Sequence, residues 1–295
     1  MHFRGKTFRA AMMYSDLHCD SVTKAYRESI SLFGGTLAVK LGSDNFIRRE
    51  QCFALWLDDK LHGEPAFSYC KELLGFYKAN EDEIKARGVT PHLTLENASS
   101  LGGDLNNIAF FKEQGLKMMS LTWNGENDLA SGVDAKGGLK PKGKEAVKEM
   151  ENCGIIIDVS HLNEKGFRDV CKIGVKPFIA SHSNCYDICP HKRNLKQWQI
   201  KEMISRGGLI GINFYPPFLG KGSAFERVGD NIEYLLSLGG ENCIALGSDF
   251  DGAEMSDELK TADDVARLYN YLIARGMSKE VVEKVFYKNA LNFLS

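Results

Sequence analysis

The amino-acid sequence predicts a single (β/α)8 barrel of the TIM type over residues 1–295. Two observations lead to this fold class. Eight short apolar runs alternate with helical patterns, and no linker, repeat or change of composition marks a domain boundary. Most of these runs are apolar at nearly every position, which is typical of parallel strands buried on both faces. An open, doubly wound sheet is the alternative, but eight alternations favour the barrel.

The elements follow one another from the N-terminus. The expected strands comprise residues 12–18, 51–57, 92–96, 117–123, 155–159, 177–180, 208–215 and 243–249. The expected helices comprise residues 68–87, 106–113, 142–151, 164–172, 194–206 and 224–238, with a final pair at 261–275 and 278–294. This final pair begins with capping patterns at Thr261 and Ser278. Residues 2–10 are expected to form an extension or a short capping strand before the barrel.

Composition and charge exclude several classes of protein. The net charge is -2 and the basic residues are scattered, so we expect neither a nucleic-acid groove nor binding to a membrane surface. No apolar run approaches the roughly 18 residues of a membrane span, and the N-terminal residues lack the apolar core of a signal peptide. The eight cysteines form no CxxC pair. We therefore expect reduced thiols and a cytoplasmic location.

Histidines stand directly after two neighbouring strands. The runs at 155–159 and 177–180 are each followed by Ser-His, which places His161 and His182 at strand ends. The first strand ends in His18-Cys-Asp20, where residues i and i+2 point to the same side. Strand carboxyl ends carry the chemistry of α/β folds. The alternative is that these are ordinary strand-end residues satisfied by hydrogen bonds, with Asp20 as the N-cap of a following helix.

Two further carboxylates complete this rim. Glu96 ends the third strand and Asp249 ends the eighth, within GSDFDG. Taken singly, Glu96 could be a charge in the first turn of a helix and Asp249 a loop-capping residue. Because all six side chains fall at the same rim of a barrel, the sequence predicts one metal site at the carboxyl ends of the strands.

The donors suit two ions better than one. His18 and Asp20 can bind the first ion, His161 and His182 the second, and Glu96 can bridge them through its two oxygens. This mixture of donors fits Zn²⁺, although Mn²⁺, Co²⁺ or Fe²⁺ could occupy the same site.

The chemistry that such a site implies is hydrolysis. A hydroxide between two ions is a nucleophile available near neutral pH, and Asp249 is placed to accept its proton. The expected reaction is attack on a carbonyl carbon.

These residues carry a resemblance to a known family. The chain resembles the membrane (renal) dipeptidase family, peptidase family M19, which belongs to the amidohydrolase-type barrels. The matching stretches are DLHCD (16–20), TLEN (94–97), DVSHLN (158–163), ASHSN (180–184), KRN (192–194), INFY (212–215) and GSDFDG (247–252). They extend from the first strand to the eighth, so the resemblance covers most of the chain.

The resemblance implies a role for each matching position. It implies two zinc ions on the five ligands named above, Asp249 as the acid/base carboxylate, and Arg193 as the group that binds a substrate carboxylate in bidentate fashion. Trp123, Asn124 and Tyr215 are further candidate substrate-binding residues. The family often has a histidine in a Thr-His context after strand four, whereas this chain has Thr-Trp123. Without the resemblance, Arg193 would be interpreted as a surface arginine at the start of a helix.

The expected function is that of a cytoplasmic, two-zinc dipeptidase of the bacterial type. Its partner is a dipeptide with a free carboxylate, with no nucleic acid or membrane, and the family allows a homodimer. The alternatives are a related hydrolase of N-acyl amino acids, cyclic amides or lactones, and a non-catalytic, metal-containing barrel that binds a small molecule.

Overall fold

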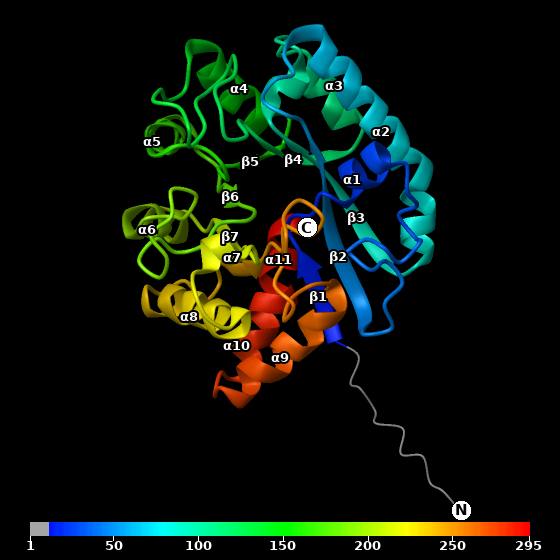
Figure 1. The fold of residues 1–295 in the computed structure, drawn as a ribbon. Helices are drawn as coiled ribbons and strands as arrows, with labels where there is room; N and C mark the ends of the chain where they lie inside the picture. The colour runs from blue at the N-terminus through cyan, green and yellow to red at the C-terminus, as the bar shows by residue number, and fades with distance from the viewer. Residues whose placement is uncertain (1–11) are drawn as a thin grey trace, which may run out of the picture.

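Eight strands form one parallel sheet in chain order (Figure 1). The computed structural model describes residues 12–295, so the expectation for residues 2–10 lies outside the described residues. The strands are β1 (Met12–Asp16), β2 (Phe46–Trp56), β3 (Val89–Glu96), β4 (Leu116–Ser120), β5 (Ile156–Asp158), β6 (Ile179–Ala180), β7 (Leu209–Ile212) and β8 (Ile244–Leu246). All eight overlap the expected runs, and β5 to β8 are shorter than expected.

The last strand returns to the first. The amide of Leu17 donates to the carbonyl of Leu246 at 2.9 Å, and Cys19 and Phe250 form a parallel bridge just beyond the strand ends. The sheet is therefore a nearly closed barrel. The (β/α)8 prediction is confirmed, and the open, doubly wound alternative is wrong.

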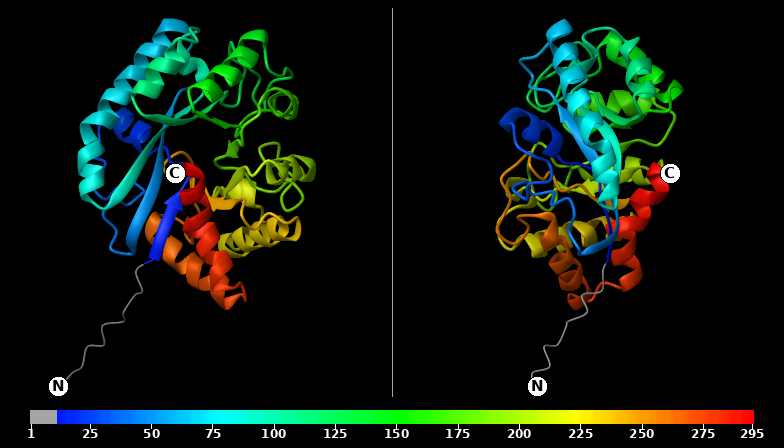
Figure 2. Two further views of the ribbon diagram at one scale, coloured as in Figure 1. Left: turned by 180° about the vertical axis from the view of Figure 1, so that it is seen from behind. Right: turned by 90° about the vertical axis from the view of Figure 1, so that its right-hand side faces the viewer.

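Helices surround this barrel on its outer face (Figures 1 and 2). They are α1 (Ser21–Glu28), α2 (Gly63–Ala86), α3 (Asn107–Glu113), α4 (Pro141–Asn152), α5 (Glu164–Ile173), α6 (Gln197–Ser205), α7 (Pro216–Leu219), α8 (Ala224–Ser237), α9 (Val265–Ala274), α10 (Lys279–Glu283) and α11 (Asn289–Leu294), with short turns η1 (Ala98–Leu101), η2 (Ala262–Asp264) and η3 (Lys284–Lys288). The two predicted caps are present: Thr261 forms a capping box with Asp264, and the Ser278 hydroxyl accepts from the Val281 amide. The helices α1 and α7 were not predicted from apolar spacing.

Apolar side chains fill the barrel and α11 closes its amino end. Five strands contribute to this cluster through Cys52, Met118, Ile179, Leu209 and Ala245. Leu17, just beyond the end of β1, and two residues of α11, Ala290 and Leu294, complete it. Asn289 donates to the carbonyls of Glu241 and Ile244, at the start of β8. Seen from behind, α11 lies across the centre of the ring (Figure 2). The carboxyl end is thus the end available for a site.

Within residues 12–295, no helix is both long and apolar enough to cross a membrane.

Candidate metal centre

All six predicted metal-site side chains lie together at the carboxyl rim of the barrel. They are the six side chains His18, Asp20, Glu96, His161, His182 and Asp249, contributed by the ends of β1, β3, β5, β6 and β8. Five of them are at most 8% exposed. The side chain of Asp249 is 13% exposed and borders the cavity above the group. We call these six residues the rim cluster.

Glu96 lies at the middle of the rim cluster. Its Oε1 is 2.7 Å from His161 Nε2 and 3.7 Å from His182 Nε2. Its Oε2 is 3.5 Å from His18 Nε2. The two oxygens of one carboxylate therefore face two different sets of histidines, which is the arrangement that a bridging ligand requires.

Asp20 faces His18 rather than the backbone. Its Oδ2 is 3.2 Å from His18 Nε2, while its Oδ1 is buried without a hydrogen-bond partner. Asp20 occupies the N-cap position of α1, as the alternative interpretation held, but its side chain accepts no bond from the first turn. Its carboxylate therefore does not act as a helix cap. A buried carboxylate oxygen with no donor is costly, and a cation would satisfy it. This observation fits a metal ligand.

His161 and His182 meet through their Nε2 atoms, which are 2.9 Å apart. On the far side of each ring, His161 Nδ1 lies 2.9 Å from Asn124 Oδ1, and His182 Nδ1 lies 2.7 Å from Ser181 Oγ. Burial holds the pKa of both imidazoles well below the usual range, so both are neutral. A neutral imidazole can offer a ring nitrogen to a metal.

His182 reaches this position because a glycine makes room for its backbone. A Cβ on Gly247 would lie 1.8 Å from the carbonyl oxygen of Ser181 and 3.2 Å from His182 Cα. Any side chain at Gly247 would therefore displace the segment that carries the histidine.

Asp249 is held at the edge of the rim cluster. Its Oδ2 accepts from Asn213 Nδ2 at 2.9 Å, and its Oδ1 is 3.8 Å from His18 Nε2. Its φ is +66°, and that of His161 is +68°, which is strained backbone for residues other than glycine and is found at functional sites. Burial raises the pKa of the Asp249 carboxyl. Donor atoms of His18, Asp20 and Asp249 lie within 4.8 Å of one another, so Asp249 is also within reach of an ion bound there.

The charges of the rim cluster favour a cation. Burial lowers the pKa of His18, but the carboxylates of Glu96 and Asp20 raise it to about 10. Burial also raises the pKa of Glu96 well above its usual range. Three carboxylates in a poorly solvated space repel one another, and a bound divalent cation would relieve that repulsion. The donor set and its charge therefore fit a metal centre.

Arg193 is buried beside the rim cluster, so its interpretation as a surface residue is wrong. It is 5% exposed, and its Nη2 donates a long bond of 3.4 Å to the carbonyl of His182. Its Cζ lies 5.4 Å from the ring centroid of Phe218, and its Nε is buried without a partner. Within residues 12–295 it forms no ion pair with a carboxylate. Arg193 borders a cavity of about 360 Å³, together with Ser183 and Asn194.

A larger cavity, of about 950 Å³, opens directly onto the rim cluster. Three candidate substrate-binding residues, Trp123, Asn124 and Tyr215, line it, whereas Arg193 lies outside its lining. Trp123 packs edge-on against Trp56, with ring centroids 5.0 Å apart. Trp123 and Trp56 thus form an aromatic wall at the position after strand four where the family often has a histidine.

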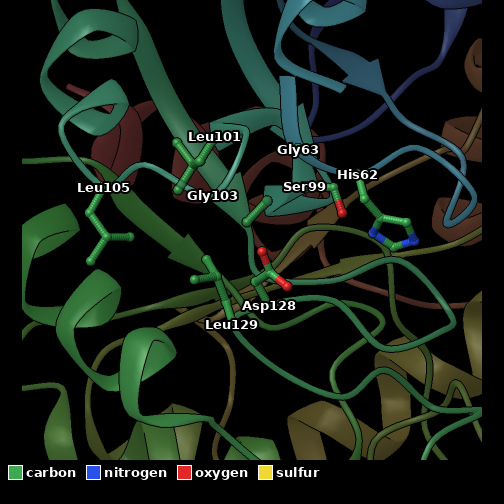
Figure 3. Close-up of a pocket in the computed structure, with 9 residues that line it drawn as sticks. His62, Gly63, Ser99, Leu101, Gly103, Leu105, Asp128 and Leu129 are labelled. Atoms are coloured by element: carbon green, nitrogen blue, oxygen red, sulfur yellow. The ribbon is translucent and has the colours of Figure 1, made fainter. Parts of the chain in front are cut away.

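A third pocket is too small to compete with these two. It lies between the start of α2, η1 and the loop before α4, where His62, Ser99 and Asp128 surround it (Figure 3). Its volume of about 10 Å³ accommodates no more than a water molecule.

Several supporting residues were not found from the sequence. Asn213 holds Asp249, Ser181 contacts His182, and Asp158 binds Ser181. The only sequence signal for such residues was an aspartate two or three positions before a strand-end histidine. It occurs as Asp16 in DLH and as Asp158 in DVSH.

Comparison with known proteins gives a consistent result. A family described as membrane dipeptidase (peptidase family M19) matches residues 69–295. An uncharacterized protein in the pqqA 5′ region of Klebsiella pneumoniae is 31% identical over 247 residues, which is 79% of this chain and 90% of that protein. Dipeptidase tcpJ of Claviceps purpurea is 31% identical over 210 residues, 68% of this chain, but the chain spans only 49% of its length.

Two solved structures share the fold. One is the dipeptidase AC, a metallopeptidase of family M19, with a TM-score of 0.87 and 23% identity over 96% of this chain and 98% of that one. The other is a metallopeptidase from Rhodobacter sphaeroides, with a phosphinate mimic of the dipeptide L-Ala-D-Ala, with a TM-score of 0.85 and 22% identity over 96% and 99%.

Proposed function

Because the chain belongs to the membrane dipeptidase family, peptidase family M19, and is a metallo-dipeptidase by class, we propose that it cleaves dipeptides with two zinc ions. The ligands in this proposal are the five side chains His18, Asp20, Glu96, His161 and His182. The observation that carries the proposal is the position of Glu96, whose two oxygens face different histidines. Zinc suits this mixture of imidazole and carboxylate donors.

When bound, the ions supply Lewis acidity, which polarises the scissile carbonyl and lowers the pKa of a nearby water molecule. Asp249 moves the proton in this proposal. Its Oδ1 faces the cluster, and the amide of Asn213 fixes its other oxygen, so it can accept a proton from the attacking water and pass it to the leaving amine. Its raised pKa favours this exchange.

Arg193 provides the positive charge that a dipeptide carboxylate needs. It is buried, has no carboxylate partner among residues 12–295, and lines the smaller cavity. It also packs over Phe218, which lines the larger cavity. A substrate carboxylate would supply the missing partner through charge-assisted bonds.

The larger cavity accommodates the rest of the substrate. Trp123 and Tyr215 form apolar walls. Asn124 has its Oδ1 engaged by His161, which leaves its Nδ2 for the substrate.

Two further parts of the proposal concern the surroundings of the enzyme. All eight cysteines are free, and four of the eight are fully buried, which supports a reducing compartment such as the cytoplasm. A homodimer remains a prediction from the family resemblance.

The test of this function combines metal analysis with a substrate panel. Zinc-loaded protein should contain close to two ions per chain, and Glu96→Gln should lose at least one. Glu254→Gln is the matched control, because Glu254 borders the same cavity outside the rim cluster. The panel contains L,L- and L,D-dipeptides and N-acyl amino acids. A ceiling of one ion would contradict the two-metal site. Turnover of N-acyl amino acids alone would indicate the related hydrolase, and no turnover of either class would indicate a binding protein.

A further inference from the structure

Asp158 ties two strands together beneath the rim cluster. It is the last residue of β5 and is 3% exposed. Its Oδ1 accepts from the backbone amides of Ser160 at 2.9 Å and Ser181 at 3.0 Å. Its Oδ2 accepts from the Ser181 hydroxyl at 2.5 Å. Both oxygens of Asp158 act as acceptors, so the single hydroxyl hydrogen of Ser181 is directed at Asp158.

This direction determines the protonation of His182. Ser181 Oγ also lies 2.7 Å from His182 Nδ1. Its hydrogen is already used, so Ser181 can only accept from the ring, and Nδ1 must carry the proton. The other nitrogen, Nε2, then keeps its lone pair, and this is the atom that faces His161 Nε2 and Glu96 Oε1.

We propose that Asp158 and Ser181 are positioning residues that hold His182 in the Nδ1–H tautomer, so that its Nε2 is ready to bind a metal ion. The inference rests on the proposed metal site and adds the residues that prepare one of its ligands. Outer partners of this kind orient metal-binding histidines and typically change metal affinity by about 10–100-fold when removed.

His161 lacks an equally fixed partner. Its Nδ1 faces the side-chain amide of Asn124, which can present either oxygen or nitrogen after a half-turn. The hydrogen bonds that Ser181 forms with Asp158 and His182 (the Ser181 relay) therefore fix the protonated ring nitrogen of His182 more firmly than Asn124 fixes that of His161.

The barrel contains a matched control at the other side of the rim. Asp16 of β1 accepts from the Ser248 amide at 2.8 Å and from its hydroxyl at 2.7 Å, in the same way that Asp158 binds Ser181. Asp16 and Ser248 are 1% and 0% exposed, so their burial also matches. Within residues 12–295 Ser248 has no hydrogen bond to an imidazole. Its hydroxyl lies 3.2 Å from the backbone carbonyl of His18, and Asp16 accepts from the His18 backbone amide at 3.3 Å, so this pair contacts the backbone of His18 but not its ring.

The decisive variant is Asp158→Asn. An asparagine can keep its oxygen on the two backbone amides while its nitrogen donates to Ser181. The hydroxyl would then donate to His182 Nδ1 and move the ring proton to Nε2. Two-bond ¹H–¹⁵N spectra of metal-free, histidine-labelled protein report the tautomer directly, with His182 assigned by its loss in His182→Gln. We expect Nδ1–H in the wild type and in Asp16→Asn, and Nε2–H in Asp158→Asn.

Zinc affinity provides the second measurement. Competition with a chelator should show that the dissociation constant for zinc is about 10–100-fold larger in Asp158→Asn than in the wild type. In Asp16→Asn it should change by at most about threefold. Ser181→Ala, which removes the relay without changing charge, should give a mixture of tautomers and a weaker zinc site. If Asp158→Asn does not fold, the tautomer and zinc affinity of Ser181→Ala test the proposal instead.

Two results would overturn the proposal: an unchanged His182 tautomer in both relay variants, or equal zinc affinities for the Asp158 and Asp16 variants. Neither measurement uses a substrate. A failure to cleave dipeptides would therefore count against the proposed function and leave this inference standing.

Discussion

Replacing Arg193 with alanine should reveal whether a substrate carboxylate is bound by a buried guanidinium. Arg193 is 5% exposed, and the one hydrogen bond that its side chain forms within residues 12–295 is long, at 3.4 Å to a backbone carbonyl. Little of its hydrogen-bonding capacity is therefore used within residues 12–295. A hydrogen bond to a charged group contributes about 1.5–3 kcal/mol. At about 1.4 kcal/mol for each factor of ten, Arg193→Ala should lower kcat/KM on a free dipeptide by about 10–150-fold.

The assay compares a free dipeptide with the same dipeptide amidated at its C-terminus. The amide has no negative charge to lose, so its kcat/KM should hardly change in Arg193→Ala. Arg193→Lys keeps the charge without the planar fork and should fall between the wild type and the alanine variant. Arg168→Ala is a control for the loss of one positive charge, because the side chain of Arg168 is 52% exposed on α5.

Equal losses on the free and amidated dipeptides would refute the carboxylate-binding role. Such a result would also fit the position of Arg193 beside the smaller cavity rather than in the lining of the larger one. The dipeptidase proposal would then give way to the broader hydrolase.

Three other substitutions test separate parts of the site. Asp249→Asn should keep both zinc ions by elemental analysis while kcat falls by roughly 10²–10⁴-fold, and loss of metal would instead identify Asp249 as a ligand. Trp123→Ala should extend the range of accepted side chains toward bulkier residues in a dipeptide panel, with metal content unchanged; an unaltered preference would contradict a role in specificity. Gly252→Ala would place a Cβ 2.0 Å from Asp20 Oδ2, so we expect reduced zinc content together with roughly 1–3 kcal/mol lower stability in denaturant titrations. A Gly252→Ala protein with full zinc content would show that Asp20 can move without loss of binding.

The residues at the strand ends could be predicted because their pattern is local. An apolar run followed by Ser-His identifies both the strand and the residue that leaves it, as at His161 and His182. Parallel pairing then brings these ends together whatever the details of the helices. The prediction that Glu96 stands between the two histidine sets needed only its place at the end of β3, and its two oxygens do face both sets.

Other features could not be predicted because they depend on contacts between distant segments. The burial of Arg193 results from its packing over Phe218 of α7, an element that the apolar spacing did not show. The direction in which the Ser181 hydroxyl donates its hydrogen depends on Asp158, which is 23 positions earlier in the chain. Apolar spacing did not indicate helix α1, because two of its four buried residues, Ser21 and Thr23, are polar. The helix packs against β2 and α2.

Closure of the barrel has a consequence for the synthesis of the chain. The first strand pairs with β2, but its other edge is completed only by β8, through the bond between Leu17 and Leu246. At a synthesis rate of about 5–20 residues per second, the roughly 230 intervening residues take about 10–45 s to appear. Throughout that interval the backbone of the growing protein presents an open strand edge, which can pair with another chain. Helix α11, which packs against β1, β7 and β8, emerges later still. The rim cluster, which uses both β1 and β8, is therefore completed only when the last strand has been synthesised.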